Sequence, residues 1–250
     1  RWRSHDEGRC QVSTDAVGTQ ETPLYPPTGE PIGEIARRTK VGLWTLIVMS
    51  VSGTLALVVS YSYLWALNVN GGWAPPGASL TSSQTNSTLP SKSDATFAPE
   101  WPFWAIFGLT VLATIAMWFG YKQLVKGHRD GMLLGGGVSL IITVAALVAQ
   151  WIQITTFPFG ASNGAYASAV LLLCAENIFN LLILVFLHIG LLNRTRKGLI
   201  SPLVYYQTKL VSYWMVWICV SVLLGALLTT FLLDSPNPEP SIFGTFKLPS

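Results

Sequence analysis

The side chains that could perform chemistry in this sequence are few, and most fall within one long apolar stretch. That stretch contains two ionisable residues, Glu176 and His188, and Cys174, Asn177 and Asn180 share a helix face with His188. A carboxyl group buried in lipid can be protonated, because burial disfavours its charged form, and it can hydrogen-bond to Asn180. The alternative is a carboxylate that exchanges protons with a neighbour. The structural role is favoured, and Glu176 is the first residue to mutate in search of chemistry.

A second polar pattern lies in the preceding apolar stretch. Its members are spaced four, three, four and three residues apart, which places them on one helix face: Ser139, Thr143, Ala146, Gln150 and Gln153. In lipid, such a face packs closely on another helix and hydrogen-bonds across it, each bond contributing about 0.6 kcal/mol. A pore wall is the alternative, but it would need charges or a second matching face. The pattern therefore favours packing over transport.

Small residues predict close helix contacts in two further places. Gly135–Gly137 opens the same stretch and allows close backbone approach. The first apolar stretch carries a surface of small residues, which predicts a tight helix contact: Ser50, Ser52, Gly53, Ala56 and Ser60.

Motifs for catalysis, cofactors or metals are missing from the sequence. His5 and His128 lie outside the apolar stretches, so the three histidines do not support haem ligation within them. Cys10, Cys174 and Cys219 share no metal-ligand or redox spacing. There is no glycine-rich phosphate loop, zinc spacing or nucleophile motif. We therefore expect no catalytic residue, bound cofactor or metal in this chain.

The elements that position these residues are five apolar stretches of membrane-spanning length. They cover residues 41–67, 101–121, 132–154, 167–192 and 210–233. A hydrocarbon core about 30 Å thick requires about 20 apolar helical residues, and the alternating pattern of barrel strands is not seen. The sequence predicts an all-α membrane bundle of five transmembrane helices.

The composition agrees with a membrane protein. Apolar residues make up 50% of the chain and charged residues only 11%, against about 25% charged in soluble domains. The net charge of +3 comes from cations at the ends of the apolar stretches, which indicates topology and not nucleic-acid binding.

Charge also predicts the orientation of the bundle. Cations concentrate before the first stretch and in alternate loops: Arg37, Arg38, Lys40, Lys122, Lys126, Arg129, Arg194, Arg196, Lys197 and Lys209. By the positive-inside rule, the N-terminus is cytoplasmic and the C-terminus external. Aromatic residues are interpreted as interfacial belts: Trp65, Trp73, Trp101, Trp104, Tyr205, Tyr206 and Tyr213.

The domain organisation follows from these spans. Residues 1–40 are expected to form a polar cytoplasmic tail, 41–233 the membrane domain with an external loop at 68–100, and 234–250 an external tail. Because the chain starts at Arg1 and not at a methionine, we expect it to be processed, incomplete or part of a longer product.

Short motifs in the first three spans resemble those of a known family. Val41–Trp44 followed by Met49–Ser50 is similar to an opening Gly-(Met/Phe)-Trp element that runs to a Ser-Glu pair, with Val51 at the Glu position. Lys126–Arg129 resembles a basic turn, and Gln150–Gln153 resembles a Gln-x-x-Glu. In this order the motifs resemble subunit III of the haem–copper oxidases, in its five-helix prokaryotic form.

The last two spans extend the resemblance and also depart from it. The family's Gly-x-His-x-x-His corresponds to Ala175–Asn180, with asparagine at both histidine positions. Tyr213–Trp214 is similar to the start of Tyr-Trp-His-Phe-Val-Asp, but the His and Asp are missing. Titratable positions have thus become neutral or apolar, so the helix scaffold is expected to persist while any proton-handling task is weakened.

The resemblance implies a non-catalytic subunit of a proton-pumping terminal oxidase in a prokaryotic inner membrane. Haem and copper would be held by the large catalytic subunit, against which this chain would pack together with other oxidase subunits. Phospholipid is the expected bound molecule. The polar contacts of the spans would involve Glu176, Asn177, Asn180, Gln150, Gln153 and His188.

Two other functions remain open from the residues alone. One is a small transporter or channel subunit that uses Glu176 and the polar face of residues 139–153. The other is a structural subunit of a different respiratory membrane complex. A membrane enzyme acting alone is disfavoured, because the spans lack paired acid–base groups and metal ligands.

Overall fold

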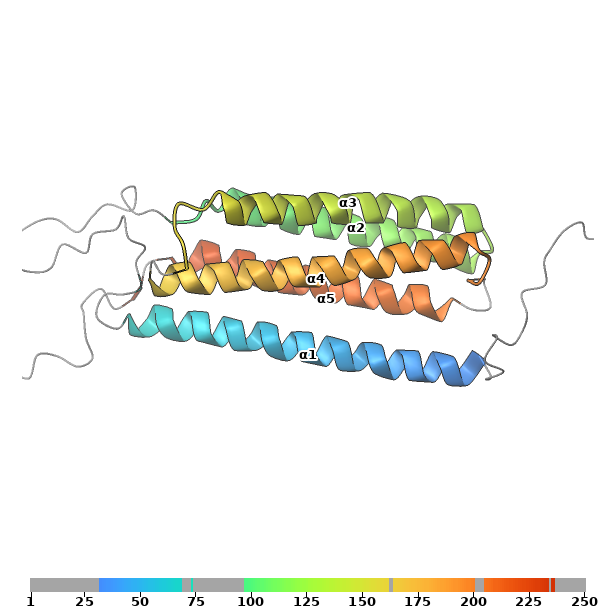
Figure 1. The fold of residues 1–250 in the computed structure, drawn as a ribbon, viewed down its shortest axis with the longest axis horizontal. Coiled ribbons are helices and arrows are strands. Elements are labelled where there is room, and N and C mark those ends of the chain that lie inside the picture. Colours follow the sequence, from blue (N-terminus) through green and yellow to red (C-terminus); the bar gives the residue numbers. More distant parts are fainter. Residues whose placement is uncertain are drawn as a thin grey trace, which may run out of the picture.

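The chain folds into a bundle of long helices. The computed structural model describes residues 32–68, 73, 97–161, 164–200, 205–233 and 235–236. Its helices are α1 (Ile32–Leu67), α2 (Trp101–Val125), α3 (Arg129–Thr155), α4 (Ala165–Arg196) and α5 (Tyr206–Phe231), shown in Figure 1. All five are long and apolar enough to cross a membrane, and the described residues contain no strand. The predicted all-α fold is confirmed, and the chain is a multi-pass membrane protein.

The helix ends differ from the predicted spans mainly at the start of α1. This helix begins at Ile32 and not at Val41, so residues 32–40, which were assigned to the polar tail, are helical. The segment after Gly33 contains no proline or glycine before Gly42 and consists largely of good helix formers, which explains the extension. The rest of the predicted tail, most of the predicted loop 68–100 and most of the C-terminal tail lie outside the described residues.

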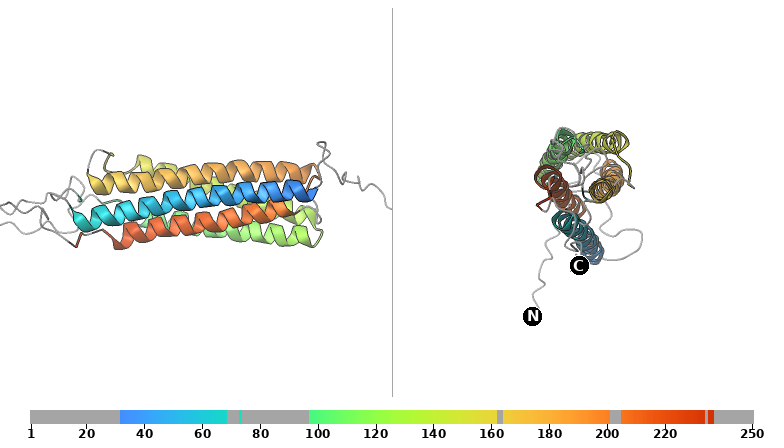
Figure 2. Two further views of the ribbon diagram at one scale, coloured as in Figure 1. Left: turned by 90° about the horizontal axis from the view of Figure 1, so that it is seen from below. Right: turned by 90° about the vertical axis from the view of Figure 1, so that its left-hand side faces the viewer.

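α1 occupies the edge of the bundle. It packs on α4 and α5, whereas α2 packs on α3 and α5, and α3 packs on α4. The end-on view in Figure 2 places α1 to one side of the other four helices. It is also the least buried of the five spans. The position of α1 in the bundle therefore depends on its contacts with α4 and α5.

The face that α1 turns toward the bundle is not the predicted surface of small residues. Ser50 is partly buried, but the other members of that surface are exposed: Ser52, Gly53, Ala56 and Ser60. The inward face instead carries Thr54 and Tyr61, both buried. The predicted tight contact is therefore not made within this chain, because Thr54 and Tyr61, which form hydrogen bonds to other segments, take the inward positions.

Glycines determine how closely α2 and α3 approach each other. A Cβ atom on Gly135 would lie 2.7 Å from the Gly120 Cα atom, and one on Gly136 would lie 2.9 Å from Leu192 Cδ2. Such distances are too short for any side chain to be added without movement. The close backbone approach predicted for this glycine run is confirmed at Gly135, whereas Gly136 accommodates the Leu192 side chain of α4 and Gly137 faces open space.

The two turns at the basic end of the bundle have the same geometry. After α2, Gly127 has a φ of 89°, and its N–H and that of His128 donate to carbonyls of the last turn of α2. After α4, Gly198 has a φ of 75°, and its N–H and that of Leu199 donate in the same manner. These are Schellman motifs, in which glycine adopts the left-handed conformation at low cost.

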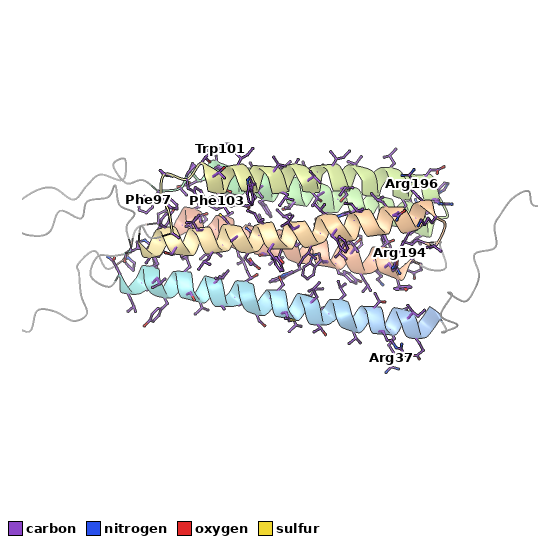
Figure 3. All side chains as sticks on the ribbon, viewed as in Figure 1. Arg37, Phe97, Trp101, Phe103, Arg194 and Arg196 are labelled. Carbon is purple, nitrogen blue, oxygen red and sulfur yellow. The ribbon has the colours of Figure 1, made fainter. Side chains whose placement is uncertain are left out.

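Arg129 connects these two turns. Its Nε donates to the Thr195 carbonyl at 2.8 Å, and its Nη2 donates to the Arg196 carbonyl. The guanidinium group therefore caps the C-terminal end of α4, where the helix dipole favours a positive charge. Figure 3 shows Arg37, Arg194 and Arg196 at this same end, which is the cytoplasmic end in the predicted orientation.

Aromatic residues pack together at the opposite end. Tyr61, Trp73 and Tyr166 form edge-to-face pairs with centroid distances of 5.0 to 6.5 Å. Trp73 is only 2% exposed, and its Nε1 donates to the Leu233 carbonyl at 2.8 Å. The interpretation of Trp73 as an interfacial belt residue was therefore wrong. Trp101, by contrast, is 73% exposed and has the exposure that a belt residue requires.

Candidate intramembrane polar site

The main polar site lies where α1, α4 and α5 meet, around the carboxyl group of Glu176. Thr54 Oγ1 on α1 donates to Glu176 Oε1 at 2.6 Å, and Asn180 Nδ2 donates to the same oxygen at 2.8 Å. Ser221 Oγ on α5 donates to Oε2 at 3.3 Å. One carboxyl group thus accepts hydrogen bonds from three helices.

Helix periodicity explains why the α4 residues act together. Asn180 follows Glu176 by four residues, so the two side chains lie one above the other on the same face of α4. The hydrogen bond expected between them is present, with the amide as donor. Asn177 is buried on the adjoining part of this face, and its Oδ1 lies 3.5 Å from Ser221 Oγ, as an alternative acceptor for the same hydroxyl proton.

The network continues through Ser50. Trp217 Nε1 donates to Ser50 Oγ at 3.0 Å, and Ser50 Oγ donates to Asn180 Oδ1 at 3.2 Å. The hydrogen bonds therefore run in one direction, from the indole through Ser50 and Asn180 to Glu176. Hydrogen bonds in such a chain polarise one another, which strengthens the final donation to the carboxyl oxygen.

The network suits a carboxyl oxygen that accepts and does not donate. The oxygens of Glu176 receive three donors, all from neutral side chains. The carboxyl group therefore joins three helices through the hydrogen bonds that it accepts.

His188 lies in a separate polar contact. It is fully buried, and its Nδ1 lies 3.0 Å from the Leu184 carbonyl, one turn earlier on α4. Its Nε2 lies 3.1 Å from Ser139 Oγ on α3, and this hydroxyl also donates to the Ala113 carbonyl on α2 at 2.8 Å. Because a carbonyl can only accept, Nδ1 carries a proton in this arrangement. The contact joins three helices without involving Glu176.

The glutamines of α3 form a third contact. Gln150 Nε2 donates to Gln153 Oε1 at 2.8 Å, and both side chains are buried. Within the described residues, Gln153 Nε2 has no hydrogen-bond partner. All members of the predicted polar face of α3 are buried against other helices: Ser139, Thr143, Ala146, Gln150 and Gln153.

The structure groups the predicted polar residues differently from the sequence. Cys174, Asn177, Asn180 and His188 are all buried on α4, but only the asparagines join the network of Glu176. Across the described part of the chain, no group of three or more His, Cys, Asp or Glu side chains could hold a metal ion.

Three members of the network were not predicted. They are Thr54, Trp217 and Ser221. A signal for them exists in the sequence, because Ser50 and Thr54 on α1, like Trp217 and Ser221 on α5, are hydrogen-bonding residues spaced by four. Pairing such residues between helices would have indicated the site.

Comparisons with known proteins do not assign this chain to a family. No protein-family model matches it, and no curated protein matches it.

Proposed function

We propose that this chain is a non-catalytic membrane subunit, similar to subunit III, of a proton-pumping haem–copper terminal oxidase. It acts in the aerobic respiratory chain of a prokaryotic inner membrane. It packs against the large catalytic subunit, which holds haem and copper and reduces oxygen, and it binds phospholipid. Its own contribution is to stabilise that partner.

One observation supports this proposal above the others. Residues from the motifs of the first and fourth spans, which are far apart in the sequence, lie in one hydrogen-bonded network together with a residue of the fifth span. Ser50, at the end of the first motif, bonds to Asn180, which stands at a histidine position of the fourth. Trp217, just after the fifth motif, donates to Ser50. Motifs that belong to one ancestral site are expected to meet in this way.

The chemistry of the network fits an accessory role. Glu176 is bound by neutral groups, so the carboxyl group joins helices and has no charged partner among the described side chains that contact it. In lipid, hydrogen bonds of this kind contribute modestly to helix association. A rigid bundle with such contacts is a suitable surface for a larger membrane subunit.

Purification of the tagged chain from its native membrane tests the proposal. The eluate should contain a large multi-helix subunit and the absorption spectrum of haem. Asn180→Leu should lower the amount of co-purified haem, whereas Ser52→Ala, a change on the exposed face of α1, should leave it unchanged. Isolation of the chain alone, without haem absorbance, would contradict the proposal. Co-purification with a complex that carries other cofactors would favour a structural subunit of that complex.

A transporter or channel subunit is the second candidate, and Glu176 is the observation that favours it. A carboxyl group within a membrane span often marks a solute or proton pathway. The reconstituted chain would then conduct a solute into liposomes, and Glu176→Gln would abolish that flux. Liposomes that show no flux above the protein-free background would exclude this alternative.

A further inference from the structure

Oxygen atoms from two neighbouring helices surround the hydroxyl group of Ser221 on α5. On α1, Thr54 Oγ1 lies 3.4 Å from Ser221 Oγ. On α4, Glu176 Oε2 lies 3.3 Å and Asn177 Oδ1 lies 3.5 Å from the same hydroxyl oxygen. The side view in Figure 2 shows α1 along the seam between α4 and α5, and these residues lie well inside their helices. We propose that these four oxygen atoms bind one sodium ion within the membrane.

The contacts of Ser221 are long for hydrogen bonds. Bonds between hydroxyl groups and oxygen acceptors are about 2.5 to 3.0 Å long, and all three contacts exceed this range. Ser221 is only 2% exposed, and its single proton can satisfy only one of its three oxygen neighbours. Thr54 Oγ1 donates its own proton to Glu176 Oε1 at 2.6 Å, so its lone pairs remain to bind a cation. Buried oxygen atoms with this excess of lone pairs favour a cation among them.

The separations fit an ion of the size of sodium. Ca²⁺, whose radius is close to that of Na⁺, binds oxygen atoms at about 2.3 to 2.6 Å, so ligands at right angles around it are about 3.3 to 3.7 Å apart. The distances of 3.3 to 3.5 Å around Ser221 Oγ fall within this range. Mg²⁺ would require oxygen atoms only about 3.0 Å apart. K⁺ is larger than Na⁺ and would require them farther apart.

The charge of the site selects a monovalent ion. The oxygen atoms of Thr54, Asn177 and Ser221 are neutral, so the carboxylate of Glu176 supplies the one formal charge among these ligands. Buried charges in proteins are paired or bind metal ions, and the side chains that donate to Glu176 are all neutral. Sodium would neutralise the carboxylate, whereas a divalent ion would leave a positive charge at bilayer depth, which is costly.

The ion would also fasten α1 to the bundle. α1 lies at the edge and is the least buried span, and the ligands of the ion come from α1, α4 and α5. Ligands from three distant segments leave no spacing motif, which explains why the sequence indicated no metal. This inference rests on the oxygen atoms around Ser221, so it does not depend on the proposed oxidase function.

Sodium binding by the full chain tests the proposal. The purified chain in detergent micelles is dialysed to equilibrium against radioactive sodium chloride, and the wild type should bind one ion per chain. Glu176→Gln should abolish binding, because it removes the charge. Ser221→Ala should weaken it at least about tenfold, the loss produced even by changes outside the direct ligands of a metal. Ser212→Ala is the matched control, because Ser212 is also buried on α5 but bonds to the Thr208 carbonyl of its own helix.

The stability of the wild type provides a second measurement that does not depend on the folding of variants. Its unfolding temperature should rise with sodium chloride and not with potassium chloride at equal ionic strength, because a ligand that binds only the folded state stabilises it. In potassium chloride, the hydrogen bonds of Glu176 alone would join the helices.

Three results would overturn the proposal. They are no sodium bound by the wild type, equal unfolding temperatures in the two salts, and sodium binding by Ser221→Ala equal to that of the wild type. Each would leave hydrogen bonding as the only role of this cluster. The measurements require no haem and no partner subunit, so their failure is distinct from failure of the oxidase proposal.

Discussion

The two sides of the bundle associate by different means. α2 and α3 meet through the backbones of Gly120 and Gly135, with no room for a side chain between them. α1 meets α4 and α5 through hydrogen bonds that converge on Glu176. Lipid tails are as apolar as leucine, so helices in a membrane gain little from burying apolar surface and depend on close packing or on polar contacts. Close packing at glycine characterises the α2–α3 interface, which also contains the bond from Ser139 to the Ala113 carbonyl, whereas a larger hydrogen-bonded network characterises the interface of α1.

The largest expected effect is a steric one at the glycine contact. Gly135→Val should destabilise the bundle by about 3 kcal/mol, because its side chain would strike the backbone of Gly120 and neither helix can move freely. Gly137→Val is the control, since that position faces open space. The measurement is unfolding of the purified chain in mixed micelles, followed by helical circular dichroism. Equal stability of the two variants would show that backbone contact at Gly135 does not limit how closely α2 and α3 approach each other.

Loss of the carboxyl group should have the next largest effect. Glu176→Leu removes the acceptor of Thr54 and Asn180 and leaves Ser221 with Asn177 Oδ1, at a cost of about 2 kcal/mol in the same unfolding assay. Glu176→Gln keeps one acceptor oxygen and should lose less than half as much. A loss in the glutamine variant as large as in the leucine variant would mean that the negative charge, and not the hydrogen bonds, stabilises the site.

A single bond between α1 and α4 should have a smaller effect. A double-mutant cycle with Ser50→Ala and Asn180→Leu should give a coupling energy of about 0.6 kcal/mol, the average for hydrogen bonds between membrane helices. The cycle of Ser52→Ala with Asn180→Leu is the control, because Ser52 is on the exposed face of α1. Equal coupling in both cycles would argue against the bond between Ser50 and Asn180.

The smallest effect is expected at the glutamine pair. Gln153→Leu removes one accepted hydrogen bond but also a buried amide nitrogen that has no partner among the described residues. The lost hydrogen bond lowers stability and the removal of the unpaired amide nitrogen raises it. The free energy of unfolding should therefore stay within about 0.5 kcal/mol of the wild type. A large loss would indicate that Gln153 Nε2 is bonded to a water molecule or a partner in the membrane.

The sequence predicted well the features that depend on neighbouring residues in one helix. The five spans follow from length and hydropathy, the contact of Glu176 with Asn180 from their spacing, and the close approach at Gly135 from the glycine run. The spans and the Glu176–Asn180 contact are decided within one segment, where helix periodicity is a strong constraint, and the glycine run marks its own point of close approach.

The features that depend on helix rotation were not predicted. The exposed side of α1 is about as apolar as its buried side, so hydrophobic periodicity does not show which face meets α4 and α5. In a soluble protein the polar face would point to water, but in lipid this signal is lost. The contacts of Thr54 and Trp217 and the bond between Ser139 and His188 therefore required the three-dimensional arrangement.

Arg129 illustrates how one side chain can act at two stages in the life of a membrane protein. In the predicted orientation, a cation at the start of a span keeps the adjoining loop from translocation during insertion. In the folded chain, the same guanidinium group binds the last carbonyls of α4. A change to glutamate would thus weaken the topogenic signal of the α2–α3 hairpin and also place an anion at the negative end of a helix dipole. Membrane insertion and the stability of the folded chain therefore both constrain which residue stands at position 129.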